Sequence, residues 1–158
     1  MNQLLISIIL SILPVSELRG GLPVAVDYAL KNNISILPIF FLIVLLNIGV
    51  IFLILFFLDF FHESLMGIPF YKKLFGFYLN SVRKRADKIE AKIPTYGYLA
   101  LTLFVAIPLP VTGAWTGTFI AWLLGLERKK SIPAIALGVL IAGIIILLAS
   151  LGVFSMIR

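Results

Sequence analysis

The chain has 158 residues, of which 61% are hydrophobic and 13% are charged, and its formal net charge is +6. This composition is far more apolar than that of soluble globular domains, and it predicts an integral membrane protein. Cysteine is absent, which excludes thiol catalysis, disulfides and cysteine-based metal sites. The length allows a single membrane domain, residues 1–158, with room for a few spans of about 20 residues each.

The first apolar region, residues 3–31, is interrupted by the stretch PVSELRGGLP. Its two arms, of about 10 to 15 residues, are too short to cross a bilayer alone, because a helix rises only about 1.5 Å per residue. Pro14 and Pro23 oppose a continuous helix, while Gly20 and Gly21 permit turns and close approach of the backbone. We therefore expect a local break in the helix here.

Two charged residues, Glu17 and Arg19, lie inside this break. A charge at membrane depth costs at least about 2.5 kcal/mol, so both side chains should be paired or hydrated. One interpretation is a mutual salt bridge that only fixes the loop. The interpretation that we favour gives Glu17 a proton or cation role and Arg19 an anion-binding role. Asp27 precedes Lys31 by four residues, and both an ordinary surface pair and a proton-relay role fit that spacing.

Two segments, residues 36–58 and residues 132–154, are long, apolar and uncharged. Each reaches roughly 34 Å as a helix, which is enough to cross the hydrocarbon core with modest tilt. We expect both to be transmembrane helices.

Residues 59–94 form a basic connection after the first span. Apolar residues recur there every three or four positions, which predicts an amphipathic helix on the cytoplasmic leaflet, attracted to anionic lipid by about 1 kcal/mol per well-placed basic residue. Nucleic acid is not an expected partner, because membrane topology explains the basic residues. The apolar stripe is Phe75, Tyr78, Val82, Ala86, Ile89 and Ile93, and the basic residues are Lys72, Lys73, Arg83, Lys84, Arg85, Lys88 and Lys92.

The second apolar region, residues 95–126, is interrupted by PLPVTGAWTG, which carries no charge. The GxxxG spacing of Gly113 and Gly117 is typical of close helix packing or dimerisation. Amides freed after Gly113 would also favour an anionic group at the start of the outgoing helix. Trp115 fits a packing or interfacial role better than ligand stacking. The candidate tip residues are Gly20, Gly21 and Pro23 in the first break, and Pro108, Pro110, Thr112, Gly113, Trp115, Thr116 and Gly117 in the second.

The distribution of basic residues predicts the topology. Arg128, Lys129 and Lys130 follow the second broken region, and both basic loops face the cytoplasm only if residues 95–126 enter and leave by the same face. A single kinked span would place the loops on opposite sides. We therefore expect an inverted repeat of re-entrant hairpin plus transmembrane helix, residues 1–58 and 95–158. Irregular backbone at membrane depth must be enclosed by protein or by a watery cavity, so the two tips should meet near the midplane and line a site.

The stretches PVSELRGGLPVA and LFVAIPLPVTGAWTGTFIAWLLG resemble the motifs ELRGxxP and PLPxTGAWTG of the prokaryotic family named putative small multidrug export proteins. That family is similar to the DedA/VTT membrane proteins, and this resemblance implies paired re-entrant hairpins and proton-coupled transport or lipid-carrier translocation. It also implies that Glu17 and Asp27 match acidic residues of the first DedA hairpin. The second break departs from the pattern, since DedA proteins carry essential arginines there; Arg19 could supply the cation from the other hairpin.

We therefore expect an all-α polytopic protein of the prokaryotic plasma membrane that works as a small exporter. Glu17 and Asp27 would exchange protons, while Arg19 and the amides of the second break hold a small amphiphilic or anionic substrate. The alternatives are a flippase or scramblase for a phosphorylated polyprenyl carrier, and a non-transporting scaffold that binds lipid or a partner helix. No nucleophile and base pair is visible and His62 has no second ligand at metal-binding spacing, so we expect no enzyme, metal site or cofactor. The short chain is compatible with a homodimer.

Overall fold

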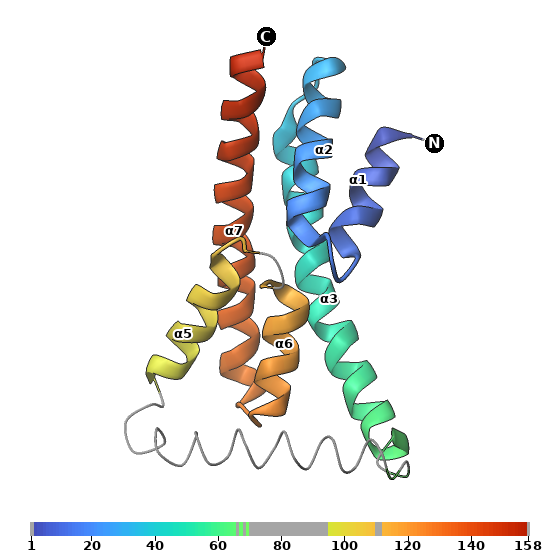
Figure 1. Cartoon of the computed structure of the whole chain (residues 1–158), viewed down its shortest axis with the longest axis vertical. Coiled ribbons are helices and arrows are strands. Elements are labelled where there is room, and N and C mark those ends of the chain that lie inside the picture. The colour runs from blue at the N-terminus through green and yellow to red at the C-terminus, as the bar shows by residue number, and fades with distance from the viewer. Residues whose placement is uncertain (1, 66, 68, 70–94, 110–111, 158) are drawn as a thin grey trace.

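The fold is all-helical in the part of the chain that the computed structural model describes, which comprises residues 2–65, 67, 69, 95–109 and 112–157. Within these ranges there are six helices and no strand (Figure 1). The expected amphipathic helix lies largely outside the described residues, as does Pro110. The helices are α1 (Gln3–Ile12), α2 (Glu17–Lys31), α3 (Ile36–Leu65), α5 (Thr95–Ala106), α6 (Ala114–Leu123) and α7 (Arg128–Ile157).

Two helices, α3 and α7, run along most of the length of the molecule (Figure 1). Ile36–Phe61 and Arg128–Met156 are long and apolar enough to cross a membrane, as their sequences predict. Both helices are longer than the apolar runs that indicated them, because α3 continues to Leu65 and α7 already begins at Arg128. The residues that begin the expected basic connection are therefore part of α3.

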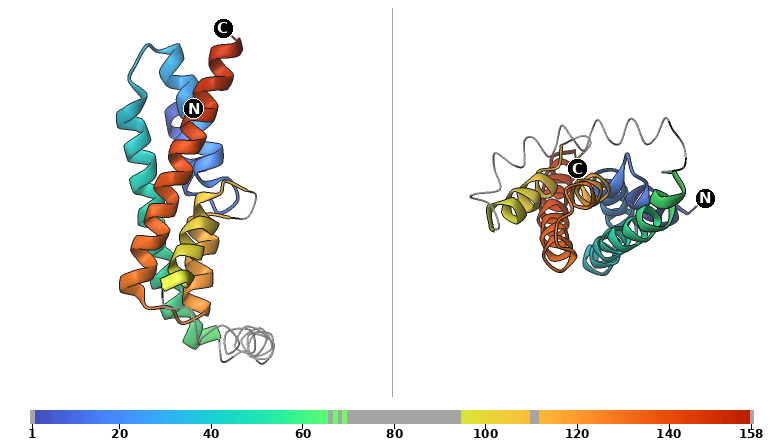
Figure 2. Two further views of the ribbon diagram at one scale, coloured as in Figure 1. Left: turned by 90° about the vertical axis from the view of Figure 1, so that its left-hand side faces the viewer. Right: turned by 90° about the horizontal axis from the view of Figure 1, so that it is seen from below.

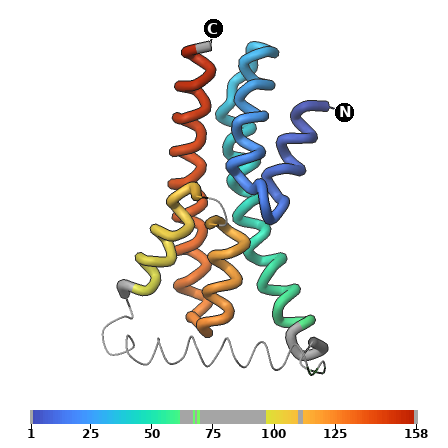
Figure 3. The backbone as a smooth tube through the Cα atoms, viewed as in Figure 1, coloured from blue at the N-terminus to red at the C-terminus, as the bar shows by residue number. Residues whose placement is uncertain are grey.

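The four shorter helices form two antiparallel hairpins in opposite halves of the molecule. In Figure 1, α1 and α2 occupy the upper half, and α5 and α6 occupy the lower half. Figure 3 shows the turn between α1 and α2 near mid-height, close to the end of α5 and the start of α6. Seen along the long axis in Figure 2, α1 to α3 lie on one side and α5 to α7 on the other. The groups join where α2 packs against α7 and where α3 packs against α6.

The core lies between these groups and consists mainly of aliphatic side chains from α2, α3, α5, α6 and α7. Its largest fully buried members are Leu22, Val26, Ile43, Ile51, Val105, Ile135 and Val139. Large apolar side chains also cover the outside of the long helices, for example Leu45, Phe56 and Leu148, which are 65%, 73% and 64% exposed. Such an apolar exterior is what a helix facing lipid requires.

The break between α1 and α2 is shorter than the PVSELRGGLP stretch. It spans residues 13–16, and Gly20, Gly21 and Pro23 lie inside α2. A Cβ atom on Gly20 would come within 2.7 Å of Ser16 Cβ, in the break itself. Gly21 serves helix packing, because a Cβ atom on it would come within 2.6 Å of the Ser7 carbonyl oxygen on α1. Small residues permit this close approach of helix backbones.

The second break likewise ends earlier than the PLPVTGAWTG stretch. Helix α6 begins at Ala114, so Trp115, Thr116 and Gly117 belong to its first turn. A Cβ atom on Gly117 would come within 2.5 Å of Val105 Cγ2 on α5. Within this chain, the second glycine of the GxxxG spacing therefore packs one arm of the hairpin against the other.

Candidate functional site

The carboxyl group of Glu17 lies at the N-terminus of α6. Its Oε1 accepts a hydrogen bond of 3.2 Å from the backbone N–H of Trp115, and a Cβ atom on Gly113 would collide with its Oε2. The first N–H groups of a helix have no partner within the helix, and they carry the positive end of the helix dipole. Glu17, which is 5% exposed, therefore caps a helix of the other hairpin.

The backbone at Glu17 has a conformation that directs the side chain out of its own helix. Its φ is +44°, in the left-handed region that costs a residue with a Cβ atom of order 1 to 3 kcal/mol. The Glu17 N–H donates to the Leu13 carbonyl at 3.0 Å, which closes the turn. Strained positions of this kind tend to occur at functional sites. The conformation of Glu17 therefore supports a functional role for this residue.

Arg19 also reaches the second break, through Thr112. Its Nη2 donates to Thr112 Oγ1 at 3.2 Å. The same hydroxyl accepts from the Leu109 N–H at 3.1 Å and donates to the Ile107 carbonyl at 2.6 Å. Among the ion pairs of the described residues, none joins Arg19 to Glu17. Glu17 and Arg19 were expected inside the first break, but they lie in the first turn of α2. From there Glu17 accepts from α6 and Arg19 donates to the second break.

The indole of Trp115, on α6, forms another contact between the two hairpins. Its Nε1 donates to the Ile12 carbonyl, at the end of α1, at 2.9 Å. The carbonyls of Leu10 and Ser11 accept from Ser16 Oγ at 2.5 Å and from Asn47 Nδ2 at 2.6 Å. The last carbonyls of a helix lack partners within the helix and are costly to leave unpaired in an apolar interior. Here the other parts of the chain pair them, which explains how the break is tolerated.

Asn47 belongs to this site although the sequence analysis did not select it. It is fully buried on α3, its Nδ2 donates to the Ser11 carbonyl in the last turn of α1, and its Oδ1 has no hydrogen-bond partner. A buried polar atom without a partner costs about 1 to 3 kcal/mol. The sequence could have indicated a role for Asn47, because it is the only strongly polar residue in the apolar run 36–58.

A small cavity of about 10 Å³ lies where the two breaks meet α3 and α7. Its polar lining comes from Glu17, Arg19, Asn47 and Thr112, while α5 and α7 contribute apolar side chains. Pro108 and Gly113 also line it. The structure thus brings Pro108, Thr112 and Gly113 together with Glu17 and Arg19 at this cavity. The other predicted tip residues that the structure describes do not line it: Gly20, Gly21, Pro23, Trp115, Thr116 and Gly117.

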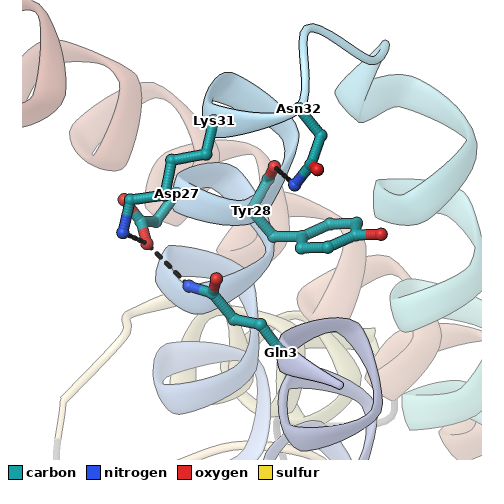
Figure 4. Close-up of polar contacts among 5 residues, drawn as sticks. All are labelled: Gln3, Asp27, Tyr28, Lys31 and Asn32. Carbon is teal, nitrogen blue, oxygen red and sulfur yellow. Dashed lines mark hydrogen bonds and ion pairs between the residues drawn. The ribbon is translucent and has the colours of Figure 1, made fainter.

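Asp27 lies away from this cavity, toward the other end of α2. Its Oδ2 accepts from Gln3 Nε2 at 2.6 Å and pairs with Lys31 Nζ at 2.7 Å (Figure 4). Ten residues of helix place it about 15 Å from Glu17 along the axis. The side-chain amide of Asn32 bonds to the Tyr28 carbonyl at 2.8 Å at this end of the helix. Asp27 therefore links the ends of α1 and α2, and it forms the Asp–Lys pair that its spacing indicated.

The comparisons with known proteins identify a family. The model of the family described as "Putative small multi-drug export protein" matches residues 17–145. This match covers well over half of the chain, so the chain belongs to that family, which is a family of exporters by its description and not a family of enzymes. No curated protein and no solved structure matches the chain. The resemblance to DedA/VTT proteins gains no support from these comparisons.

Proposed function

We propose that this member of an exporter family is a small, proton-coupled membrane transporter whose site is the contact between the two helix breaks. The observation that carries the proposal is the Glu17 carboxyl group, which belongs to one hairpin and caps the first helix turn after the other break. Ionisable groups inside membrane proteins are expensive, and they commonly mark ion or substrate pathways. Transporter sites are commonly built from broken helices whose N-termini point at anionic groups.

The proposed topology is an inverted repeat in which α1–α2 and α5–α6 are re-entrant hairpins from opposite faces. Helices α1 and α6 have 10 residues each, so each reaches only about 15 Å, half of a hydrocarbon core. Helices α3 and α7 would cross completely. Arg128, Lys129 and Lys130 begin α7, which is separated from the end of α6 by four residues, and the positive-inside bias favours a cytoplasmic location for that end.

In the proposed mechanism the two breaks separate and rejoin as the site is exposed to one side and then to the other. An ionised Glu17 is attracted to the positive N-terminus of α6, an interaction of about 0.3 to 2 kcal/mol. Protonation removes that charge and frees the α6 amides for an anionic group of an amphiphilic substrate. Arg19 would bind the same group through charge-assisted hydrogen bonds. The ionised Glu17 carboxylate and the anionic group of the substrate would thus compete for one helix end, and proton binding to Glu17 would favour substrate binding.

The proposed partners are membrane lipids and a second copy of the chain. Anionic lipid would bind the basic residues between Lys72 and Lys92, which lie outside the described residues. The apolar exterior of α3 and α7 faces lipid in this proposal, and a homodimer would cover part of it. A phosphorylated lipid carrier would present the same anionic chemistry to Arg19 as a soluble anion would, so a flippase is the first alternative function. A non-transporting scaffold is the second alternative.

The test is uptake by purified protein in liposomes with an imposed pH gradient. The probes are one anionic and one cationic amphiphilic dye, and a phosphorylated polyprenyl lipid with a fluorescent headgroup. Wild-type protein should accumulate a dye only with the gradient, and Glu17→Gln should lower accumulation to the level of empty liposomes. Asp27→Asn is the matched control, because it removes a carboxylate from the same helix but not from the cavity.

Three results would contradict the proposal. Full gradient-driven uptake by Glu17→Gln would remove this residue from the mechanism. Movement of the lipid probe alone, independent of the gradient, would favour the flippase. Lack of movement of any probe by folded wild-type protein would favour the scaffold.

A further inference from the structure

We propose that the cavity beside Glu17 is a binding site for one water molecule, which bridges Asn47 Oδ1 to the Glu17 carboxyl group. Asn47 would thereby be a positioning residue for Glu17, held on a helix that crosses the membrane. This inference rests on the proposed proton role of Glu17 for its functional meaning, but the site itself follows from contacts of the described residues.

The first support is the orientation of the Asn47 amide. A carbonyl oxygen can only accept a hydrogen bond, so the amide nitrogen of Asn47 must face the Ser11 carbonyl, to which it donates at 2.6 Å. The amide oxygen is then fixed on the opposite side, without a partner. Buried polar atoms in native proteins almost always have a partner, and ordered water is a common one.

The second support is the size and the lining of the cavity. Its volume of about 10 Å³ suits one water molecule. A buried water needs two to four polar partners, and the residues that line this cavity include Glu17, Arg19, Asn47 and Thr112. Among the lining residues, Glu17 and Arg19 are the charged ones, and those from α5 and α7 are apolar.

Water suits this position because it both donates and accepts hydrogen bonds. One O–H can donate to Asn47 Oδ1. Toward Glu17, the same water can donate its second O–H to a carboxylate or accept the O–H of a carboxylic acid. The bridge therefore holds Glu17 from the side of α3 in both protonation states, which a group that takes up and releases a proton requires.

The experiment is infrared difference spectroscopy of the reconstituted protein between acidic and alkaline pH, in ordinary water and in water labelled with ¹⁸O. The wild type should show a water O–H band that responds to pH and shifts with ¹⁸O. Asn47→Leu should lose this band, because the acceptor is gone. Ala142→Val should also lose it, because the added methyl groups fill the cavity from α7 while the Asn47 to Ser11 hydrogen bond is kept.

Two control variants change buried residues that do not line the cavity. Thr118→Val removes a buried hydroxyl that is already bonded to the Ala114 carbonyl, and Ala121→Val enlarges a buried alanine on α6. Both should keep the isotope-sensitive band. Absence of the band from the wild type, or its persistence in Ala142→Val, would overturn the proposal.

The identity of the occupant is tested separately by thermal melts in sodium, potassium and choline chloride. A water site predicts the same melting temperature in all three salts. Stabilisation by sodium alone that Ala142→Val abolishes would mean that the cavity binds a cation, and would overturn the water assignment. These readouts do not depend on transport, so a protein that has the band but moves no dye would refute the proposed function and leave the water site standing.

Discussion

The carboxyl group of Glu17 accepts a hydrogen bond from the backbone N–H of Trp115, a residue 98 positions later in the chain. This single contact connects the start of α2 with the first turn of α6. It also depends on Gly113, because any side chain there would occupy the space of the carboxyl group. The geometry of the contact leads to predictions that need no knowledge of the substrate.

Gly113→Ala should destabilise the protein by about 1 to 3 kcal/mol, since the new methyl group displaces Glu17 and strains the backbone at a φ of +153°. The measurement is the melting temperature in detergent. Gly49→Ala is the control, because a Cβ atom there meets nothing within 4 Å, and alanine favours the helix by up to about 1 kcal/mol. Equal stability of Gly113→Ala and the wild type would contradict the close contact.

Two substitutions of Glu17 should distinguish the contribution of its hydrogen bond to stability from the contribution of its charge. Glu17→Ala removes the cap of α6 and should cost about 0.5 to 2 kcal/mol. Glu17→Gln keeps an oxygen acceptor for the Trp115 N–H and should cost less. Thermal melts of both variants at neutral pH test this order. If Glu17→Gln is as unstable as Glu17→Ala, charge and not hydrogen bonding would dominate the contact.

Trp115→Phe should destabilise the break between α1 and α2. The change keeps an aromatic ring but leaves the Ile12 carbonyl without its indole donor, at a cost of about 1 kcal/mol or more. Trp122→Phe is the comparison, because its indole donates at 3.2 Å to the exposed carboxylate of Asp59, which water can replace. A larger loss of melting temperature in Trp122→Phe would contradict the role assigned to Trp115.

Arg19 and Thr112 should be energetically coupled across the two breaks. A double-mutant cycle with Arg19→Met and Thr112→Val should give an interaction energy of at least about 0.5 kcal/mol, since the residues share a hydrogen bond of 3.2 Å. The cycle of Arg19→Met with Asp27→Asn should be additive within about 0.5 kcal/mol, because Asp27 lies away from the cavity. Additive behaviour of the first pair would show that the observed bond contributes nothing to stability.

The re-entrant topology can be tested with single cysteines, since the chain has none of its own. Cysteine at Lys84 and at Lys129 should react with a membrane-impermeant reagent from the same side, and cysteine at Lys31 from the opposite side. This follows from the short arms of the hairpins and from the distribution of basic residues. Reaction of Lys84→Cys and Lys129→Cys from opposite sides would make residues 95–126 a kinked span.

The sequence determined the local structure of this protein because helix length and helix breaks depend on neighbouring residues. Two long apolar runs gave α3 and α7, and proline and glycine located both breaks to within a few residues. The sequence also selected Glu17, Arg19, Thr112 and Gly113, since charge and glycine are conspicuous in an apolar chain. The prediction that Gly20, Gly21 and Pro23 lie in the break was wrong, because all three lie inside α2. Glycine can end a helix, but it also permits close packing inside one.

Only the tertiary structure decided which of these residues meet. Nothing local to Glu17 indicates that it caps α6, and nothing local to Asp27 indicates that its carboxylate accepts a hydrogen bond from Gln3 at the start of α1. Asn47 belongs to the site because packing of α3 against the end of α1 brings its amide to the Ser11 carbonyl. Contacts between segments so distant in sequence depend on how the helices pack around one core, and each residue's own neighbours carry little information about that packing.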